Sequence, residues 1–366
     1  MSNINLNLKP GCKTTAMAIM PHTSPEKAID LSLTLDIPFW PQLPNVSFYD
    51  DMYAQASYDF PGVVVDHDQQ KMAFDTARFE KELNYYSLRM DEPGNFVLNQ
   101  DYGAVYKQFL NNDLRHYPAI HGQISGPVNL GFRIQDEDSK PIIYNDSIRS
   151  LLFDFIQRKF NAQYRQLKEK NQNAFVWLDE PGLIWVFSGL SGYNDVQAKQ
   201  EYQVFLDGLE GLKALHLCSN VNLPFLLRLG IEFLSFDAYQ IDIMPKGYAS
   251  SVAQFIKGGG IISWGIVPTE PVSLSKETPE TLAGRLIDYW EVVSQNTGLP
   301  VIQIARQALV APAKCCVKSL EFNTSDNSTA CATRGSTGST AEEQSVEKAY
   351  TYLKILSQIL KDKFNL

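Results

Sequence analysis

Short apolar runs recur along the chain and predict the strands of one sheet. Each run is continuously hydrophobic rather than alternating with polar residues, as expected for strands that are covered on both faces. The predicted strands are residues 14–20, 62–66, 118–126, 173–181, 212–218, 231–239, 260–268 and 306–312. Longer segments with helical patterning, such as 147–171 and 278–298, lie between most of them. This alternation predicts a (β/α)8 TIM barrel spanning residues 1–366 as a single domain, with a doubly wound open sheet as the alternative.

Two stretches depart from this pattern. The proline-rich sequence "IPFWPQLPN" (37–45) is too apolar for a linker. We expect it to pack across one end of the barrel, as part of an N-terminal segment over residues 1–60. Residues 322–345 are rich in Ser, Thr, Gly and Ala, which predicts a flexible surface insertion before a C-terminal helix over 346–364. Cys331 lies in this insertion, and we expect it to have no part in the functional site.

The composition and charge of the chain indicate which partners and which cellular compartment to expect. The 366 residues are 44% hydrophobic and carry a formal net charge of −9 without a basic block, so nucleic acid is not an expected partner. No run of about eighteen apolar residues is present, so no membrane span is expected. The first residues lack the apolar core of a signal peptide, and the five cysteines are unevenly scattered. We therefore expect a cytoplasmic protein with reduced thiols.

Polar and sulfur-bearing side chains follow several of the predicted strands. In a TIM barrel, functional groups collect where strands end and the following loops begin. The residues at these positions are Asp66, Gln123, Asp179, Glu180, His216, Cys218, Asp237, Trp264, Cys315 and Cys316. Any strand must end in something polar, but this does not explain the concentration of His, Cys and Asp, which are metal-binding types.

The stretch "LHLC" (215–218) contains one of only five histidines and one of only five cysteines. Positions i and i+2 of a strand point to the same side, so His216 and Cys218 can present a nitrogen and a sulfur to one point. Zinc needs three or four ligands, and these are two. On spacing alone, a buried cysteine that acts as a small hydrophobic residue remains the alternative.

Several motifs together resemble a known superfamily. "HLC", "LSFDAY", a cysteine after the final strand and "LDEPG" one strand earlier resemble the catalytic half of cobalamin-independent methionine synthase, whose superfamily includes uroporphyrinogen decarboxylase. "AIMPHTSPEKAIDL", "IPFWPQLPN" and "WGIVPT" resemble its single-barrel, methionine-synthase-like branch. The resemblance covers the chain from about residue 10 onward except the insertion, and it is more specific for the superfamily than for the substrate.

The resemblance implies a zinc ion at the carboxyl ends of the strands. The His-x-Cys pair falls on His216 and Cys218, and the family's glutamate falls on Asp237, whose shorter side chain reaches less far. The last cysteine ligand falls on "PAKCCV", where matching from the following helix selects Cys315, with Cys316 as the alternative. Zinc deprotonates a bound thiol, and the thiolate is the nucleophile in methyl transfer.

The resemblance also implies which residues meet a homocysteine-like thiol. Asp179 of "LDEPG" matches the aspartate that holds the amino group, and Glu180 is expected to orient that loop as a second catalytic residue. Asp-Glu-Pro-Gly is also a good turn sequence anywhere, which is the plain alternative. Gln123, His22 and Trp264 are expected to contact the substrate from neighbouring strand ends.

The methyl donor is expected to be a methylated corrinoid protein. The family uses a histidine after the seventh strand to help protonate folate, but no histidine follows His216 here. A methyl–corrinoid donor needs no such proton. Two other functions compete with the methyltransferase. One is a metal-free decarboxylase of the uroporphyrinogen type, which is disfavoured because "MPHTSPEK" lacks arginine; the other is a non-catalytic zinc- or thiol-binding protein.

Overall fold

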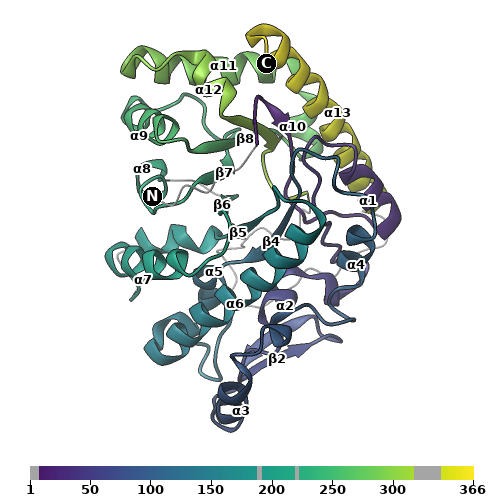
Figure 1. The fold of residues 1–366 in the computed structure, drawn as a ribbon, viewed down its shortest axis with the longest axis vertical. Helices are drawn as coiled ribbons and strands as arrows, with labels where there is room; N and C mark the ends of the chain where they lie inside the picture. The colour runs from purple at the N-terminus through teal and green to yellow at the C-terminus, as the bar shows by residue number, and fades with distance from the viewer. Residues whose placement is uncertain (1–7, 188–191, 219–221, 317–338) are drawn as a thin grey trace.

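In the computed structural model, which describes residues 8–187, 192–218, 222–316 and 339–366, seven parallel strands form one curled sheet. Their spatial order is β1-β9-β8-β7-β6-β5-β4. The strands are β1 (Lys13–Thr14), β4 (His121–Ser125), β5 (Phe175–Asp179), β6 (Lys213–Leu217), β7 (Phe233–Asp237), β8 (Ile261–Val267) and β9 (Ala308–Pro312). Helices cover the outside of the curl (Figure 1). The chain is therefore an α/β protein with a curled parallel sheet, as the apolar runs predict.

The helices follow the strands in sequence. The longer ones are α3 (Thr76–Arg89), α6 (Asp146–Lys170), α7 (Asp195–Asp207), α9 (Lys246–Lys257), α11 (Pro279–Thr297) and α13 (Ser339–Phe364). The shorter ones are α1 (Pro25–Ser32), α2 (Met52–Ser57), α4 (Ala104–Leu110), α5 (Pro127–Arg133), α8 (Leu223–Leu226), α10 (Pro271–Ser275) and α12 (Val301–Arg306). Within the described ranges, no helix combines the length and apolar character needed to cross a membrane.

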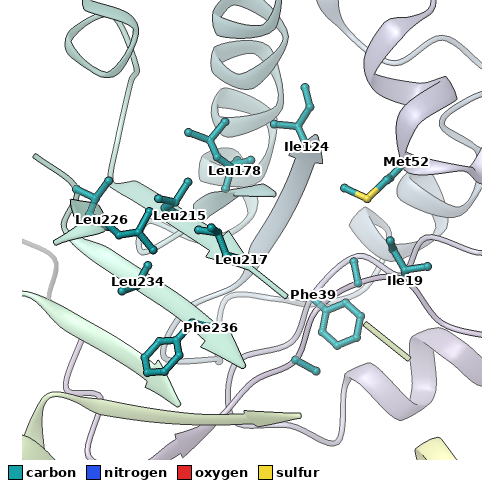
Figure 2. Close-up of a cluster of buried hydrophobic side chains, with 14 of the residues drawn as sticks. Ile19, Phe39, Met52, Ile124, Leu178, Leu215, Leu217, Leu226, Leu234 and Phe236 are labelled. Atoms are coloured by element: carbon teal, nitrogen blue, oxygen red, sulfur yellow. The ribbon is translucent and has the colours of Figure 1, made fainter. Parts of the chain in front are cut away.

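Both faces of the sheet are apolar, which explains the continuous hydrophobic runs. Side chains such as Trp177 and Phe233 gather in one cluster on the concave face. Their neighbours in sequence, such as Leu178 and Leu234, belong to a second cluster that includes the surrounding helices. Figure 2 shows several of these outward-facing side chains on adjacent strands. Alternate residues of each strand thus fill two separate cores.

The predicted strand 62–66 does not belong to this sheet. Val63–Asp66 (β2) pairs antiparallel with Lys71–Phe74 (β3), and the hairpin lies near α3 at one end of the molecule (Figure 1). In the turn between them, Asp66 Oδ1 accepts a hydrogen bond from the Gln69 N–H at 2.8 Å, and Gln70 has a left-handed backbone. A run this short can satisfy its backbone in a local hairpin, so the prediction of a barrel strand is wrong.

The proline-rich segment takes the place that this strand was expected to fill. Ile37 N–H donates to Thr14 O at 3.0 Å on one side, and Trp40 N–H donates to His121 O at 3.2 Å on the other. Residues 37–42 therefore connect the two edges of the sheet, β1 and β4, and do not pack across an end as expected. Pro38 and Pro41 have no N–H, so isolated bridges replace a regular ladder.

The two ends of the chain meet at β1. Helix α13 packs against β1 and β9, and Ser357 donates a hydrogen bond to Cys12 O at 2.7 Å. This helix begins at Ser339, so residues 339–345 are helical rather than part of the expected insertion. The rest of that insertion, with Cys331, lies outside the described residues.

Candidate metal centre

Three potential ligands meet at the carboxyl ends of β5 and β6. The ligand atoms of Asp179, His216 and Cys218 all lie within 4.8 Å of one another. Asp179 and His216 are register partners in the parallel pair of strands, so their side chains lie level and on the same face. Cys218 follows His216 by two residues and returns to that face. The i, i+2 prediction for His216 and Cys218 is consistent with this placement.

His216 is held with one nitrogen available. Its ring is 1% exposed, and Nδ1 forms a 3.0 Å hydrogen bond with Ser235 Oγ on β7. Its Nε2 is buried and has no hydrogen-bond partner in the described part of the chain. Burial lowers the pKa of His216 to about 3, and nearby His121 acts in the same direction. A neutral imidazole whose Nδ1–H donates to Ser235 keeps a lone pair on Nε2, which is the form that binds a metal.

The two adjacent cysteines after β9 occupy different environments. Cys315 forms a thiol–thiol hydrogen bond with Cys218, and this contact together with burial raises the pKa of Cys315 well above its usual value. Cys316 packs in the outer hydrophobic core, and burial raises its pKa to about 12. The Cys316 N–H donates to Ile19 O at 3.0 Å. The structure thus brings Cys315 to the candidate centre and directs Cys316 away from it.

The two aspartates do not lie as the sequence predicts. Asp179, expected to hold a substrate amine, belongs to the group of three, while Asp237, expected as a ligand, does not. The strand register explains this result: Ser235 is the β7 residue level with His216, so Asp237 lies one step further along the rim. Asp237 Oδ1 accepts a hydrogen bond from Gln240 N–H at 3.2 Å. Burial raises the pKa of Asp237 to about 6, and Lys314 opposes that shift.

Asp179 is a buried carboxyl group beside His216 and Cys218. Its side chain is 2% exposed, and its Oδ1 is buried without a hydrogen-bond partner among the residues that the structure describes. Burial raises the pKa of Asp179 to about 7. A buried carboxyl with a vacant oxygen gains stability from a cation, either a metal ion or an ammonium group.

Glu180 is adjacent to Asp179 in sequence, but its carboxylate binds α5, the helix that follows β4. Its two carboxylate oxygens accept hydrogen bonds from the N–H groups of Val128 at 3.0 Å and Asn129 at 2.7 Å, in the first turn of α5. Tyr202 adds a third donor at 3.2 Å. Burial raises the pKa of Glu180 to about 8, and these hydrogen bonds oppose the shift. A Cβ on Gly126 would overlap this carboxylate, so Glu180 and Gly126 together fix where α5 begins.

The three expected substrate contacts are dispersed. Trp264 packs outward, with its ring centroid 6.1 Å from that of Trp290 on α11. Side chains alternate along β8, so Trp264 points to the opposite face from Ser263 and Gly265 on either side of it. The substrate role expected for Trp264 is therefore wrong. Gln123 donates to Trp40 O at 3.0 Å, which joins β4 to the proline-rich segment. Burial lowers the pKa of His22, and the carboxylates of Glu343 and Glu347 on α13 oppose that shift.

Tyr53 lies near the candidate ligands Asp179 and Cys218, and Arg133 contacts its ring, although no sequence motif indicated either residue. Tyr53, on α2, is 3% exposed. Burial raises the pKa of its phenol; the acidic groups of Asp179 and Cys218 add to the shift, and Arg133 opposes it. The Arg133 guanidinium, at the end of α5, lies 4.0 Å from the centroid of the Tyr53 ring. These residues are far apart in sequence, so only the fold could reveal their proximity.

Two solved structures share this fold across nearly the whole chain. One is a B12-independent methionine synthase from Shewanella sp. W3-18-1 in complex with selenomethionine, with 12% identity and a TM-score of 0.52, covering 98% of this chain and 99% of that one. The other is a methyltransferase from Methanosarcina mazei, with 13% identity and a TM-score of 0.52, covering 98% and 95%. No protein-family model and no curated protein matches the sequence. At these identities the likeness establishes a shared fold.

Proposed function

We propose that this protein is a zinc-dependent methyltransferase that methylates a small thiol. The observation that carries the proposal is the group at the ends of β5 and β6, where His216 Nε2 and the Cys218 and Asp179 ligand atoms converge, with Cys315 bonded to Cys218. The likeness to a methionine synthase and a methyltransferase supports the reaction class. We also propose a TIM-barrel architecture, in which residues 37–42 occupy the second strand position.

The donor set fits zinc. Nitrogen from His216 and sulfur from Cys218 and Cys315 are ligands that zinc prefers, and three protein ligands leave one position open in a catalytic site. Buried His216 Nε2 otherwise lacks a partner within the described ranges, which a metal would supply. When bound, zinc supplies Lewis acidity that lowers the pKa of a thiol held in the open position. Cys218 and Cys315 must both be reduced to bind zinc, which fits the reducing, cytoplasmic location that we propose.

The protein's own residues position the reactants. Ser235 orients the His216 ring through Nδ1. Glu180 is a positioning residue, because its carboxylate holds the first turn of α5 through the N–H groups of Val128 and Asn129. Asp179 pairs with an ammonium group on the thiol substrate. In the reaction, the substrate sulfur forms a bond to the methyl carbon, the bond from methyl to donor breaks, and its electron pair leaves with the donor. The thiol proton passes to solvent.

A methylated corrinoid protein is the methyl donor that we propose. Cobalt accepts the electron pair of the broken carbon–cobalt bond, so no proton has to be delivered to the leaving group. This matches a chain in which no histidine follows His216. Methylcobalamin is a small-molecule substitute for this partner in an assay.

The test compares two thiols in an Asp179→Asn variant, with methylcobalamin as donor. Loss of a charge-assisted contact costs about 1.5–3 kcal/mol, so kcat/KM for homocysteine should fall about ten- to a hundredfold. Methylation of 2-mercaptoethanol, which has no amine, should stay nearly unchanged, as should the zinc content. Asp237→Asn is the matched control.

Three outcomes separate the alternatives. Equal losses for both thiols, with loss of zinc, would make Asp179 a ligand and reject its pairing with an amine. Equal losses at full zinc content would assign it to support of the loop. Failure of the wild-type protein to methylate any thiol from methylcobalamin or from a methylated corrinoid protein would reject the methyltransferase itself.

A further inference from the structure

Arg133 is an unpaired cation at the edge of the candidate centre. Its side chain is exposed, and the structure shows no hydrogen bond or ion pair for its guanidinium among the described residues. Arg149 provides a contrast, since its guanidinium binds Glu201 through Nε at 3.0 Å and Asp146 through Nη2 at 2.9 Å. The five N–H donors of Arg133 are thus available to a ligand.

The position of this guanidinium is restrained although it is exposed. It lies 4.0 Å from the centroid of the Tyr53 ring, and Tyr53 is itself almost fully buried. Its helix, α5, is anchored at its first turn by the Glu180 carboxylate and at its end by the hydrogen bond from Ile134 N–H to Leu130 O. An arginine stacked on a fixed aromatic ring loses less side-chain entropy when it binds a ligand than a freely rotating one.

The same ring connects Arg133 to the candidate metal ligands. Tyr53 lies close enough to Asp179 and Cys218 for both to act on its phenol. The strand before α5, β4, ends at Ser125, which is the register partner of Asp179. The helix that carries Arg133 thus begins at the rim where Asp179 lies, and the Arg133 guanidinium contacts the same tyrosine on which Asp179 and Cys218 act.

We propose that Arg133 is a specificity-determining residue that binds an anionic group, a carboxylate or sulfonate, on the thiol substrate. This inference rests on the proposed function, because it concerns the far end of the molecule whose sulfur is methylated. A planar guanidinium binds carboxylate or sulfonate oxygens through two parallel N–H donors, a geometry that lysine cannot reproduce. Tyr53 acts as the platform that holds the guanidinium in place.

The test measures the binding of matched thiols to the zinc-loaded protein by calorimetry. The probes are 3-mercaptopropionate, 2-mercaptoethanesulfonate and the neutral 3-mercapto-1-propanol. The wild-type protein should bind the anionic thiols about ten- to a hundredfold more tightly than the neutral one, the range expected for a charge-assisted contact. Arg133→Gln should remove this preference and leave the affinity for the neutral thiol unchanged, whereas Arg133→Lys should retain part of it.

Arg306→Gln is the matched control. Arg306 is exposed at the end of α12, directly before β9, and so lies at the opposite ends of the strands from the ligand group. This variant should keep the full preference for anions. Tyr53→Phe keeps the ring and should keep most of it, while Tyr53→Leu should weaken it.

The outcomes distinguish this inference from the proposed function. An equal loss of affinity for charged and neutral thiols in Arg133→Gln, or no preference in the wild-type protein, would overturn the role of Arg133. Methylation of thiols without any preference for anions would reject the inference and leave the methyltransferase intact. Binding of anionic thiols through Arg133 without methyl transfer would support the inference and reject the reaction.

Discussion

Two regions of the molecule are built in different ways. In the regular part, from β4 to β9, neighbouring strands pair in parallel, with one register shift between β8 and β9 at residues 265–267. Asp179, His216, Cys218 and Cys315 all lie at or just beyond the ends of these strands. In the irregular part, from residue 13 to 74, the chain has a two-residue β1, a proline-interrupted segment and an antiparallel hairpin. Phe39 in the irregular part is nevertheless 0% exposed, so it is as deeply buried as the core side chains of the regular part. Side-chain packing and a few hydrogen bonds therefore suffice to join the sheet edges without a regular ladder.

Removing a ligand of the proposed zinc ion from the regular part should abolish metal binding, and this is the largest effect that we expect. Cys218→Ser and Cys315→Ser should each abolish stoichiometric zinc, measured by elemental analysis after dialysis, because a hydroxyl is a poor zinc ligand compared with a thiolate. Cys316→Ser, one residue away and directed into the core, is the matched control and should keep a full equivalent. Zinc lost from the Cys316 variant and kept in the Cys315 variant would reverse the assignment.

The irregular part should be as sensitive to lost packing as the regular part. Phe39→Ala and Phe233→Ala each remove a buried ring, so each should lower the free energy of unfolding by about 3–5 kcal/mol. Chemical denaturation measures both, and Leu88→Ala, at a side chain 83% exposed, should change it by less than about 0.5 kcal/mol. If Phe39→Ala costs less than about 1 kcal/mol while Phe233→Ala costs the full amount, residues 37–42 are only loosely held.

A buried acid should make the irregular part sensitive to pH. Asp50 is 4% exposed, and burial raises its pKa to about 7, against about 3.9 in the unfolded chain. The folded state therefore retains this proton, and the stability it contributes is complete below about pH 4 and is lost as pH rises through 7. Asp50→Asn should gain stability relative to wild type between pH 5 and 8, by about 3 kcal/mol at most.

The exposed Asp138→Asn is the control for that measurement, which is a series of denaturation curves across pH. Its stability relative to wild type should stay constant over the same range. A constant difference for Asp50→Asn as well would show that its carboxyl is solvated when ionised, and that the irregular part is more open than its burial indicates.

The predictive value of the sequence differed between the two parts for a physical reason. Runs such as 173–181 and 231–239 are long enough that only burial on both faces explains them, and they correspond to β5 and β7. The run 62–66 has the same apolar character, but it is short and followed by turn-forming residues. This run therefore pairs with the adjacent segment Lys71–Phe74 instead of joining the large sheet. The prolines of residues 37–42 did not favour a strand in the sequence. In the structure this segment nevertheless forms hydrogen bonds with the edges of β1 and β4, whose backbone groups need partners.

The candidate site shows the same division at the level of single side chains. The sequence by itself determined that His216 and Cys218 share a face, because alternation within one strand is a local property of the backbone. Only the tertiary structure decided that Asp179 rather than Asp237 is level with His216, that Cys315 rather than Cys316 meets Cys218, and that Arg133 lies on Tyr53. Those choices depend on the register between strands and on the docking of helices, which are set by packing among residues far apart in the chain.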